Sequence, residues 1–92
     1  MLVIRRQKSF SKDLTKVKMS NQHYSKYILY LSTLMQENIL PIEAKDHSLS
    51  GQYQDTREFH VSGDLLIIYF TTETELVLIR IGSHSQLLIK LI

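Results

Sequence analysis

The spacing of apolar residues changes once along this chain, and the change limits the folds open to it. Helical spacing runs from residue 8 to about residue 38, whereas short strand-like runs fill the chain from residue 56 onward. A chain that keeps its helices and strands apart in this way forms an α+β fold. We therefore expect two N-terminal helices packed on a small twisted, mainly antiparallel sheet.

The first helix is predicted to begin at Lys8 or Ser9. From there Phe10, Leu14 and Val17 recur at a spacing that brings them to one side of a helix. The lysines of this region fall on the opposite side, so we expect them to be displayed to solvent.

The second helix is predicted to begin after Ser20, because serine is a good N-cap residue. We expect it to end at Asn38 or Ile39, since Pro41 disfavours helical geometry at the residue before it. A broad apolar stripe along this helix indicates that it covers the core: Tyr24, Tyr27, Ile28, Leu31, Leu34 and Met35.

Strands are predicted on both sides of these helices. The unbroken apolar run Leu65–Phe70 is typical of a central strand covered on both faces. We expect Gly82 and Ser83 to end the last strand, and the residues from His84 onward are too few to assign. The predicted strands are Leu2–Arg6, Thr56–Val61, Leu65–Phe70 and Leu76–Ile81, with irregular structure over 41–55.

Basic residues are concentrated near the start of the chain. Residues 1–27 hold seven lysines and arginines against Asp13 alone, a net charge of +6, whereas residues 28–92 carry a net −4. A cationic third of a small domain favours a polyanionic partner, either a nucleic acid or an acidic protein. The alternative is a solvated helix face with no partner.

Composition excludes several classes of function. The chain has no cysteine, which excludes disulfides, thiolate zinc sites and cysteine nucleophiles and fits a reducing cytoplasm. The longest apolar run has six residues, far short of the roughly 20 that span a bilayer. Apolar residues precede the basic ones at the start, the reverse of a secretory signal. We therefore expect a cytoplasmic protein with no membrane partner.

Three histidines lie beside predicted turns or strand ends: His47, His60 and His84. Because one strand of a meander ends near the start of the next, we expect His60 and Asp64 at neighbouring sheet positions. Imidazoles beside a cationic surface suit RNA cleavage, in which one group takes the 2′-hydroxyl proton and another protonates the leaving 5′-oxygen. A zinc site and purely structural histidines are the alternatives. His23 belongs to another region, where we expect a helix-face or capping contact.

Several blocks of this sequence resemble YafQ-type toxins of the RelE/ParE superfamily, the toxin half of bacterial type II toxin–antitoxin pairs. In the family these blocks read approximately Asp-His-x-Leu-x-Gly, Arg-x-x-His-x-x-x-Asp and Arg-x-Gly-[Ser/Thr]-His. The matching residues lie within 45–51, 56–69 and 80–87, and 8–13 resembles the family's opening helix. The resemblance covers nearly the whole chain, so residues 1–92 are expected to form a single toxin domain.

The resemblance implies an endoribonuclease that cuts messenger RNA, commonly within the ribosomal A site, and needs no metal ion or cofactor. His47, His60, Asp64 and His84 would form its catalytic set. His60 and His84 would transfer protons and contact the phosphate, His47 would assist, and Asp64 would orient an imidazole or act as the base. A cognate antitoxin would neutralise the enzyme, and operator DNA would be bound only through the antitoxin complex.

Candidate phosphate contacts come from two groups of basic residues. Arg57 and Arg80 lie on predicted strands, where each could instead pair with an acidic neighbour, Glu58 or Glu75. The lysines of the N-terminal third could hold RNA phosphates or receive an acidic antitoxin segment: Lys12, Lys16 and Lys18.

One position departs from the family pattern. Members often carry phenylalanine four residues after the last histidine, where it helps to hold a base, and this chain has Leu88. The departure keeps open a catalytically silent binding module that acts with an antitoxin as a transcriptional co-repressor. The apolar residues 89–92 could add a strand, cover the sheet or lie in a partner interface.

Overall fold

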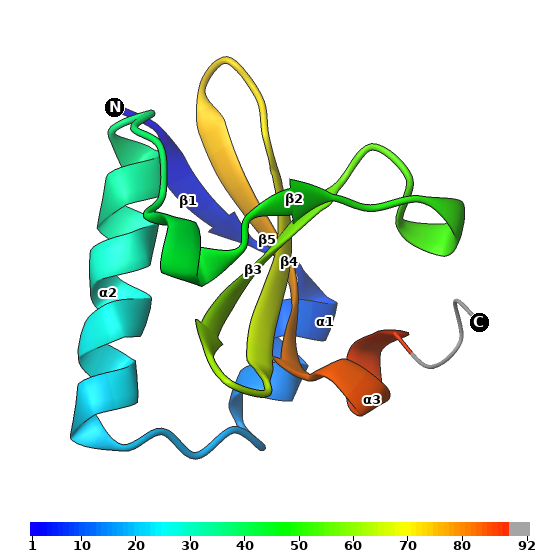
Figure 1. The fold of residues 1–92 in the computed structure, drawn as a ribbon. Helices are drawn as coiled ribbons and strands as arrows, with labels where there is room; N and C mark the ends of the chain where they lie inside the picture. The colour runs from blue at the N-terminus through cyan, green and yellow to red at the C-terminus, as the bar shows by residue number, and fades with distance from the viewer. Residues whose placement is uncertain (89–92) are drawn as a thin grey trace.

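A computed structural model describes residues 1–88, and Figure 1 shows an α+β fold in which the sequence expectation is confirmed. The helices are α1 (Lys8–Leu14), α2 (Asn21–Met35) and α3 (His84–Leu88), with short 3₁₀ turns at η1 (Ile42–Ala44) and η2 (Gly51–Tyr53). The strands are β1 (Val3–Arg6), β2 (His47–Ser48), β3 (Arg57–Ser62), β4 (Leu65–Thr71) and β5 (Glu75–Ser83). Among the described residues, no helix is long and apolar enough to span a membrane.

The five strands form one sheet in the order β1-β5-β4-β3-β2. β1 runs parallel to β5, with Val3 opposite Glu75, and the other three pairs are antiparallel. The sheet therefore joins the first strand of the chain to the last, and β4 lies at its centre.

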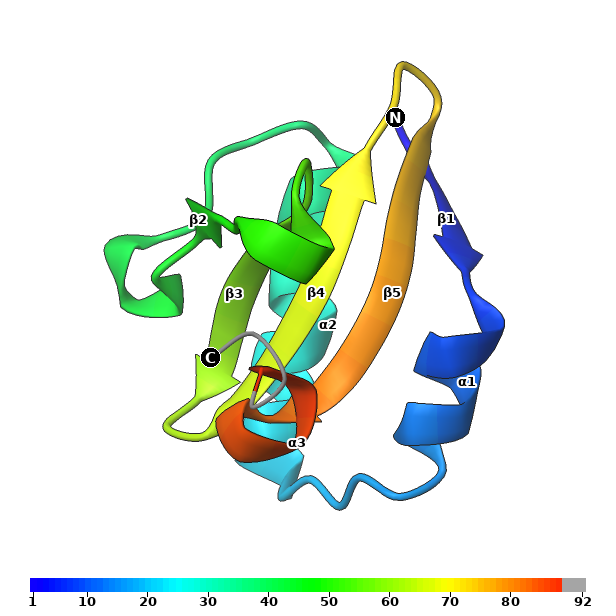
Figure 2. The ribbon, with the colours of Figure 1, turned by 90° about the vertical axis from the view of Figure 1, so that its right-hand side faces the viewer.

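Helix α2 covers one face of the sheet, and α1 packs beside β5. The core under α2 contains Phe10, Tyr30, Phe59 and Tyr69 among its buried residues. The opposite face carries η2 and α3, which lie in front of the strands in Figure 2. A smaller cluster fills that side: Leu66, Ile68 and Leu87, with Leu49, Tyr53 and Ile79 packed against it. The expectation that Leu65–Phe70 is covered on both faces is confirmed.

Helix α1 is shorter than predicted. It ends at Leu14, because the Lys16 and Val17 amides bond to carbonyls three residues back instead of four. The Thr15 hydroxyl also donates to the carbonyl of Lys12, at 2.7 Å. Val17 still packs against the core, but it does so from the segment that joins the two helices.

Helix α2 begins as predicted, since the Ser20 hydroxyl accepts a hydrogen bond from the His23 amide at 3.1 Å. The prediction that it ends at Asn38 or Ile39 is wrong. Glu37 adopts a left-handed conformation, with φ of 60°, and the Asn38 amide bonds back to the carbonyl of Thr33. These two features form a helix-ending motif, so the helix ends at Met35, well before Pro41.

The prediction that Gly82 and Ser83 interrupt the last strand after Ile81 is also wrong. Both residues belong to β5, which continues to Ser83, and Gly82 pairs with Leu66. A Cβ at Gly82 would lie 2.9 Å from Oε1 of Gln86, so glycine there lets α3 turn back closely over the sheet. The region predicted to be irregular contains β2, which exists through its pairing with β3. The proposed roles of the tail over 89–92 lie outside the described residues.

Candidate functional site

The sheet face that points away from α2 gathers most of the candidate residues. Directly paired residues of antiparallel strands share a face, so His47, Glu58, Ile68 and Arg80 form one row across four strands. Neighbouring strands lie about 4.8 Å apart, and the row therefore spans about 14 Å. His60 lies in the next row, opposite Leu66. This face is the one in front in Figure 2.

Glu58 lies between two histidines. Its Oε1 is 3.0 Å from Nε2 of His47 and 3.6 Å from Nε2 of His60. Glu58 is only 2% exposed, and its Oε2 has no hydrogen-bond partner among residues 1–88. A buried carboxylate oxygen without a partner destabilises the fold, and such groups occur where chemistry needs them. Glu58 is therefore a candidate functional residue, whereas its sequence context indicated only a possible partner for an arginine.

The ring of His47 has a polar neighbour at each nitrogen. Nδ1 lies 2.7 Å from the carbonyl oxygen of Lys45, which can only accept, so Nδ1 is the donor in this contact. Nε2 lies 3.0 Å from Oε1 of Glu58. The ring of His47 therefore bridges a backbone carbonyl and the buried carboxyl group of Glu58.

Asp64 and His84 meet at the end of this face. Asp64 lies in the turn between β3 and β4, and its Oδ1 accepts a hydrogen bond from the His84 amide at 3.3 Å. The expectation of neighbouring sheet positions for His60 and Asp64 is wrong, since a bulge after His60 shifts the pairing to Ser62 opposite Leu65 and Asp64 lies in the turn, outside both strands. Asp64 instead fixes the start of α3, and with it the exposed His84.

Arg80 is held in place by three contacts. Its Nε lies 2.6 Å from Oδ2 of Asp13 and its Nη2 lies 3.1 Å from Oδ1, while Nη1 donates to the Tyr53 hydroxyl at 3.3 Å. The hydrogen bonds that Arg80 donates to Asp13 raise the pKa of Arg80 above its ordinary value. Asp13 also accepts from the Ile81 amide, at 3.1 Å. Arg80 is therefore a fixed cation in the row, and its partner is neither of the two acids considered from the sequence.

Arg57 lies on the other face of the sheet. It is directly opposite Tyr69, whose ring is in the core under α2, and its Nε lies 3.1 Å from Oδ1 of Asp46. The Tyr69 hydroxyl donates to both oxygens of Asp46. Burial and the bonds to Asp46 raise the pKa of Tyr69 above its ordinary value. The structure does not bring Arg57 together with the candidate catalytic residues.

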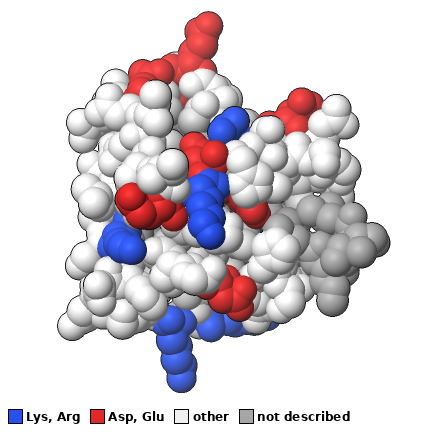
Figure 3. Space-filling model, in the orientation of Figure 1, with Lys and Arg blue, Asp and Glu red and all other residues white. Residues whose placement is uncertain are grey.

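The three candidate lysines are divided by position. Lys16 and Lys18 line cavities between the α1–α2 segment and the end of the sheet, whereas Lys12 lies on α1 outside them. His23 was left out of the catalytic set predicted from the sequence. Its side chain lines one of these cavities, and its backbone amide donates to the Ser20 hydroxyl in the capping contact. Figure 3 shows basic side chains projecting from the end of the molecule where that segment lies, with acidic ones mostly toward the other end.

Three residues of this face escaped the sequence analysis: Glu58, Asp13 and Tyr53. For Glu58 a signal existed, because it shares the side of its strand with His60 in the alternating pattern. Asp13 was visible as the only acid among seven basic residues. Within residues 1–88, no group of three or more histidine, aspartate or glutamate side chains is arranged to hold a metal ion.

Comparisons with known proteins agree on one family. Residues 2–89 match the model of a family described as bacterial toxin of type II toxin–antitoxin system, YafQ. The mRNA interferase toxin YafQ of Escherichia coli K12 is 36% identical over 80 residues, which cover 85% of this chain and 86% of that protein.

Two solved structures share the fold. YafQ in the E. coli DinJ–YafQ toxin–antitoxin complex has a TM-score of 0.79 at 29% identity, covering 94% of this chain and 96% of the other. A copper-bound mutant toxin from Helicobacter pylori has a TM-score of 0.81 at 34% identity, covering 95% of this chain and 99% of the other.

Proposed function

This chain belongs to the YafQ family of toxins from type II toxin–antitoxin systems, and we propose that it is an endoribonuclease that cleaves messenger RNA by histidine acid–base chemistry without a metal. The observation that supports this most strongly is the row of His47, Glu58 and Arg80 on one sheet face, with His60 beside it. The row combines imidazole and carboxyl groups, which can transfer protons, with the fixed cation Arg80, which can bind a phosphate.

Each group has a role in the cleavage. His60 accepts the proton of the attacking 2′-hydroxyl, and Glu58, 3.6 Å from its Nε2, stabilises the imidazolium that forms. The 2′-oxygen bonds to phosphorus as the bond from phosphorus to the 5′-oxygen breaks. His84 donates its proton to that 5′-oxygen, and Arg80 stabilises the charge on the phosphate. The products are a 2′,3′-cyclic phosphate and a 5′-hydroxyl.

Two residues support these groups. His47 holds Glu58 in position through the 3.0 Å contact between its Nε2 and the carboxylate. Asp64 sets the position of His84 by accepting a hydrogen bond from its backbone amide. Asp64 therefore positions the proposed acid, His84. The proposed mechanism does not use Asp64 as the base, which was the other role considered for it.

The partners follow from the substrate and the family. The E. coli relative is seen bound to the antitoxin DinJ, and we expect a cognate antitoxin to cover the site of this chain. We also expect the ribosome to present the messenger RNA in the cytoplasm, and operator DNA to be bound only through the antitoxin complex. The lysines expected to hold RNA phosphates are Lys12, Lys16 and Lys18; their replacement weakens binding more at low salt than at high salt.

The test is cleavage by purified protein, with and without EDTA, of free messenger RNA and of messenger RNA held by translating ribosomes. Cuts only on ribosomes, ending in 2′,3′-cyclic phosphate, support the proposal in full. Cuts in both samples support the chemistry and remove the need for a ribosome. Cuts that disappear with EDTA overturn the metal-free mechanism, an arm made necessary by the copper-bound relative. No cuts in either sample favour the silent co-repressor.

A further inference from the structure

Two adjoining cavities lead away from the proposed active site. The first, of about 190 Å³, is lined by Asp13 and Arg80, and the second, of about 320 Å³, reaches His23 and Ser62. Both are lined by Lys16, Val17 and Gln86, so together they form one cleft that runs from the catalytic arginine to the start of α2. We propose that this cleft binds the RNA strand beside the cleaved bond, with a second phosphate held by Lys18 and His23.

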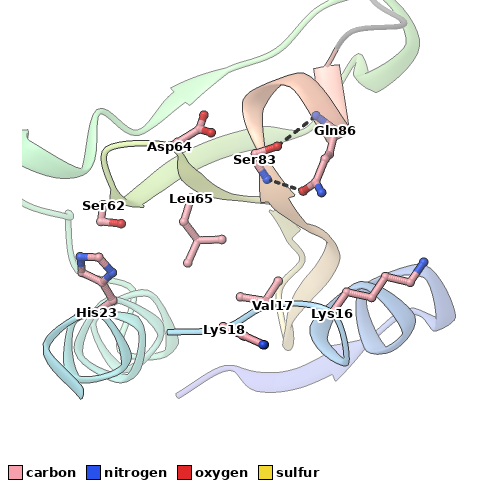
Figure 4. Close-up of a pocket in the computed structure, with 9 residues that line it drawn as sticks. All are labelled: Lys16, Val17, Lys18, His23, Ser62, Asp64, Leu65, Ser83 and Gln86. Atoms are coloured by element: carbon pink, nitrogen blue, oxygen red, sulfur yellow. Dashed lines mark hydrogen bonds between the residues drawn. The ribbon is translucent and has the colours of Figure 1, made fainter. Parts of the chain in front are cut away.

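The walls of the wider cavity have the chemistry that a nucleotide needs. Figure 4 shows His23 rising from α2 toward Ser62, with Leu65 and Val17 facing each other across the gap. The hydroxyl group of Ser62 can form a hydrogen bond to a ribose, and the side chains of Leu65 and Val17 can contact a base or sugar ring. A volume near 300 Å³ lies at the lower end of the range for ligand cavities, as suits one nucleotide.

The charge of this cavity is available for an anion. Among residues 1–88, the side chains of Lys16, Lys18 and His23 have no hydrogen-bond or ion-pair partner. The cavity's own carboxylate, Asp64, points out of the gap in Figure 4 and bonds to the His84 amide.

The position of the cleft favours RNA as the occupant. A strand whose cleaved phosphate lies at Arg80 reaches this cleft if it continues past the ends of β4 and β5, where the cleft opens beside Asp64 and Ser83. This inference rests on the proposed RNA substrate. It adds a subsite that the catalytic chemistry does not require and that binds phosphate without reading sequence.

The test measures the affinity of RNA of increasing length. Fully 2′-O-methylated oligonucleotides of two to six nucleotides lack the attacking hydroxyl, so binding is measured without cleavage. Lys18→Gln and His23→Gln remove the proposed contacts, and Lys8→Gln removes an exposed lysine of α1 that lies outside both cavities. For the original protein and Lys8→Gln we expect affinity to rise steeply with length.

Lys18→Gln should bind the dinucleotide normally and the hexanucleotide roughly five- to tenfold more weakly. Its slope of log affinity against log salt should fall by about 0.7, the value for one phosphate contact to a single strand. His23→Gln should lose the same length dependence to a smaller extent. Equal hexanucleotide affinities for Lys18→Gln and Lys8→Gln overturn the subsite, as does a Lys18→Gln defect confined to binding of the cognate antitoxin.

The outcomes separate this inference from the proposed function. If the original protein cleaves messenger RNA but the RNA affinity of Lys18→Gln still rises fully with oligonucleotide length, the proposed function stands and the proposed subsite is wrong. A protein that cleaves no RNA, yet binds longer oligonucleotides through Lys18, loses the proposed enzymatic function and keeps the cleft as an RNA-binding surface.

Discussion

His47 and Glu58 meet across two neighbouring strands, with Nε2 of the histidine 3.0 Å from Oε1 of the glutamate. Nδ1 of the same ring lies 2.7 Å from the Lys45 carbonyl oxygen, so each ring nitrogen has a polar neighbour. The two residues come from β2 and β3 and face each other directly in the ladder. The two-residue strand β2 therefore brings an imidazole to the buried carboxyl group.

Replacing this carboxyl group separates activity from stability. Glu58→Gln keeps the shape of the side chain but removes the charge that is proposed to stabilise the His60 imidazolium, so we expect cleavage to fall by about 10²–10⁴-fold. Thermal stability should change little, because the amide removes the buried charge but still leaves one buried polar atom without a partner. Glu75→Gln, at an exposed pair with Arg5, is the control and should change neither property. A Glu58→Gln protein that cleaves at the original rate contradicts the role of this residue.

Loss of either proposed proton-transfer histidine should abolish toxicity. His60→Ala and His84→Ala are each expected to prevent growth arrest on induction, since one removes the base and the other the acid. Both variants should remain folded and bind the antitoxin, which circular dichroism and co-purification would check. Unchanged toxicity in both variants would eliminate the proposed site.

Asp13 is expected to act through Arg80. Asp13→Asn weakens two bonds to the guanidinium and alters the acceptor for the Ile81 amide, so we expect a loss of about 1–3 kcal/mol in the free energy of unfolding. Cleavage at saturating RNA should fall as well, because Arg80 is no longer fixed. Denaturant titration and single-turnover cleavage measure the two effects. Glu75→Gln should cost less than about 1 kcal/mol, as usual for an exposed pair; equal losses for the two variants would contradict the prediction.

The two glycines near α3 and the β3–β4 turn form a matched pair. Gly82→Ala places a Cβ 2.9 Å from Gln86 Oε1 and 3.2 Å from Leu87 Cδ2, so both side chains of α3 must shift and the bond from the Ser83 amide to Gln86 Oε1 is disturbed. We expect a loss of about 1–3 kcal/mol in stability together with reduced cleavage. Gly63→Ala meets no atom within 4 Å and should preserve both. If the two alanine variants behave alike, close packing of α3 on β5 is not what positions His84.

The raised pKa of Tyr69 predicts that the folded protein loses stability at high pH. Burial, together with the bonds to Asp46, raises its pKa above the ordinary value of 10.0, so the unfolded chain loses this proton at a lower pH than the folded protein. Stability is therefore complete below about pH 10 and falls as pH rises beyond it, by up to about 1.4 kcal/mol per pH unit. Tyr69→Phe should be less stable at pH 7 and show a shallower decline above pH 10. Parallel declines in urea titrations would refute this assignment.

The sequence predicts the fold class because the apolar period reports burial residue by residue. Leu65–Phe70 is apolar throughout, and the structure covers it on both faces. The ends of elements were less predictable, since they depend on single local contacts such as the left-handed Glu37. β2 could not be recognised from its own two residues, because it is defined by its pairing with β3.

The site was predictable in its residue types and less so in its contacts. The histidines stand out in the sequence because imidazole suits acid–base chemistry. Their partners depend on folding, which brings Glu58 opposite His47 and brings Arg80 to Asp13, 67 residues away. A periodic pattern carries no information on such pairs, so the acidic partners proposed from strand neighbours were wrong for both Arg57 and Arg80.

The strand order has a consequence for the nascent chain during synthesis. β1 is made first, but its partner in the sheet is β5, since Val3 pairs with Glu75. The ladder next to α1 cannot close until residue 78 has emerged from the ribosome, and the row of Glu58 and Arg80 must also wait for it. His84 emerges later still. A growing polypeptide of this topology therefore has not assembled the proposed site while most of it is being translated, and the site forms only as the last strand and the helix after it become free to fold.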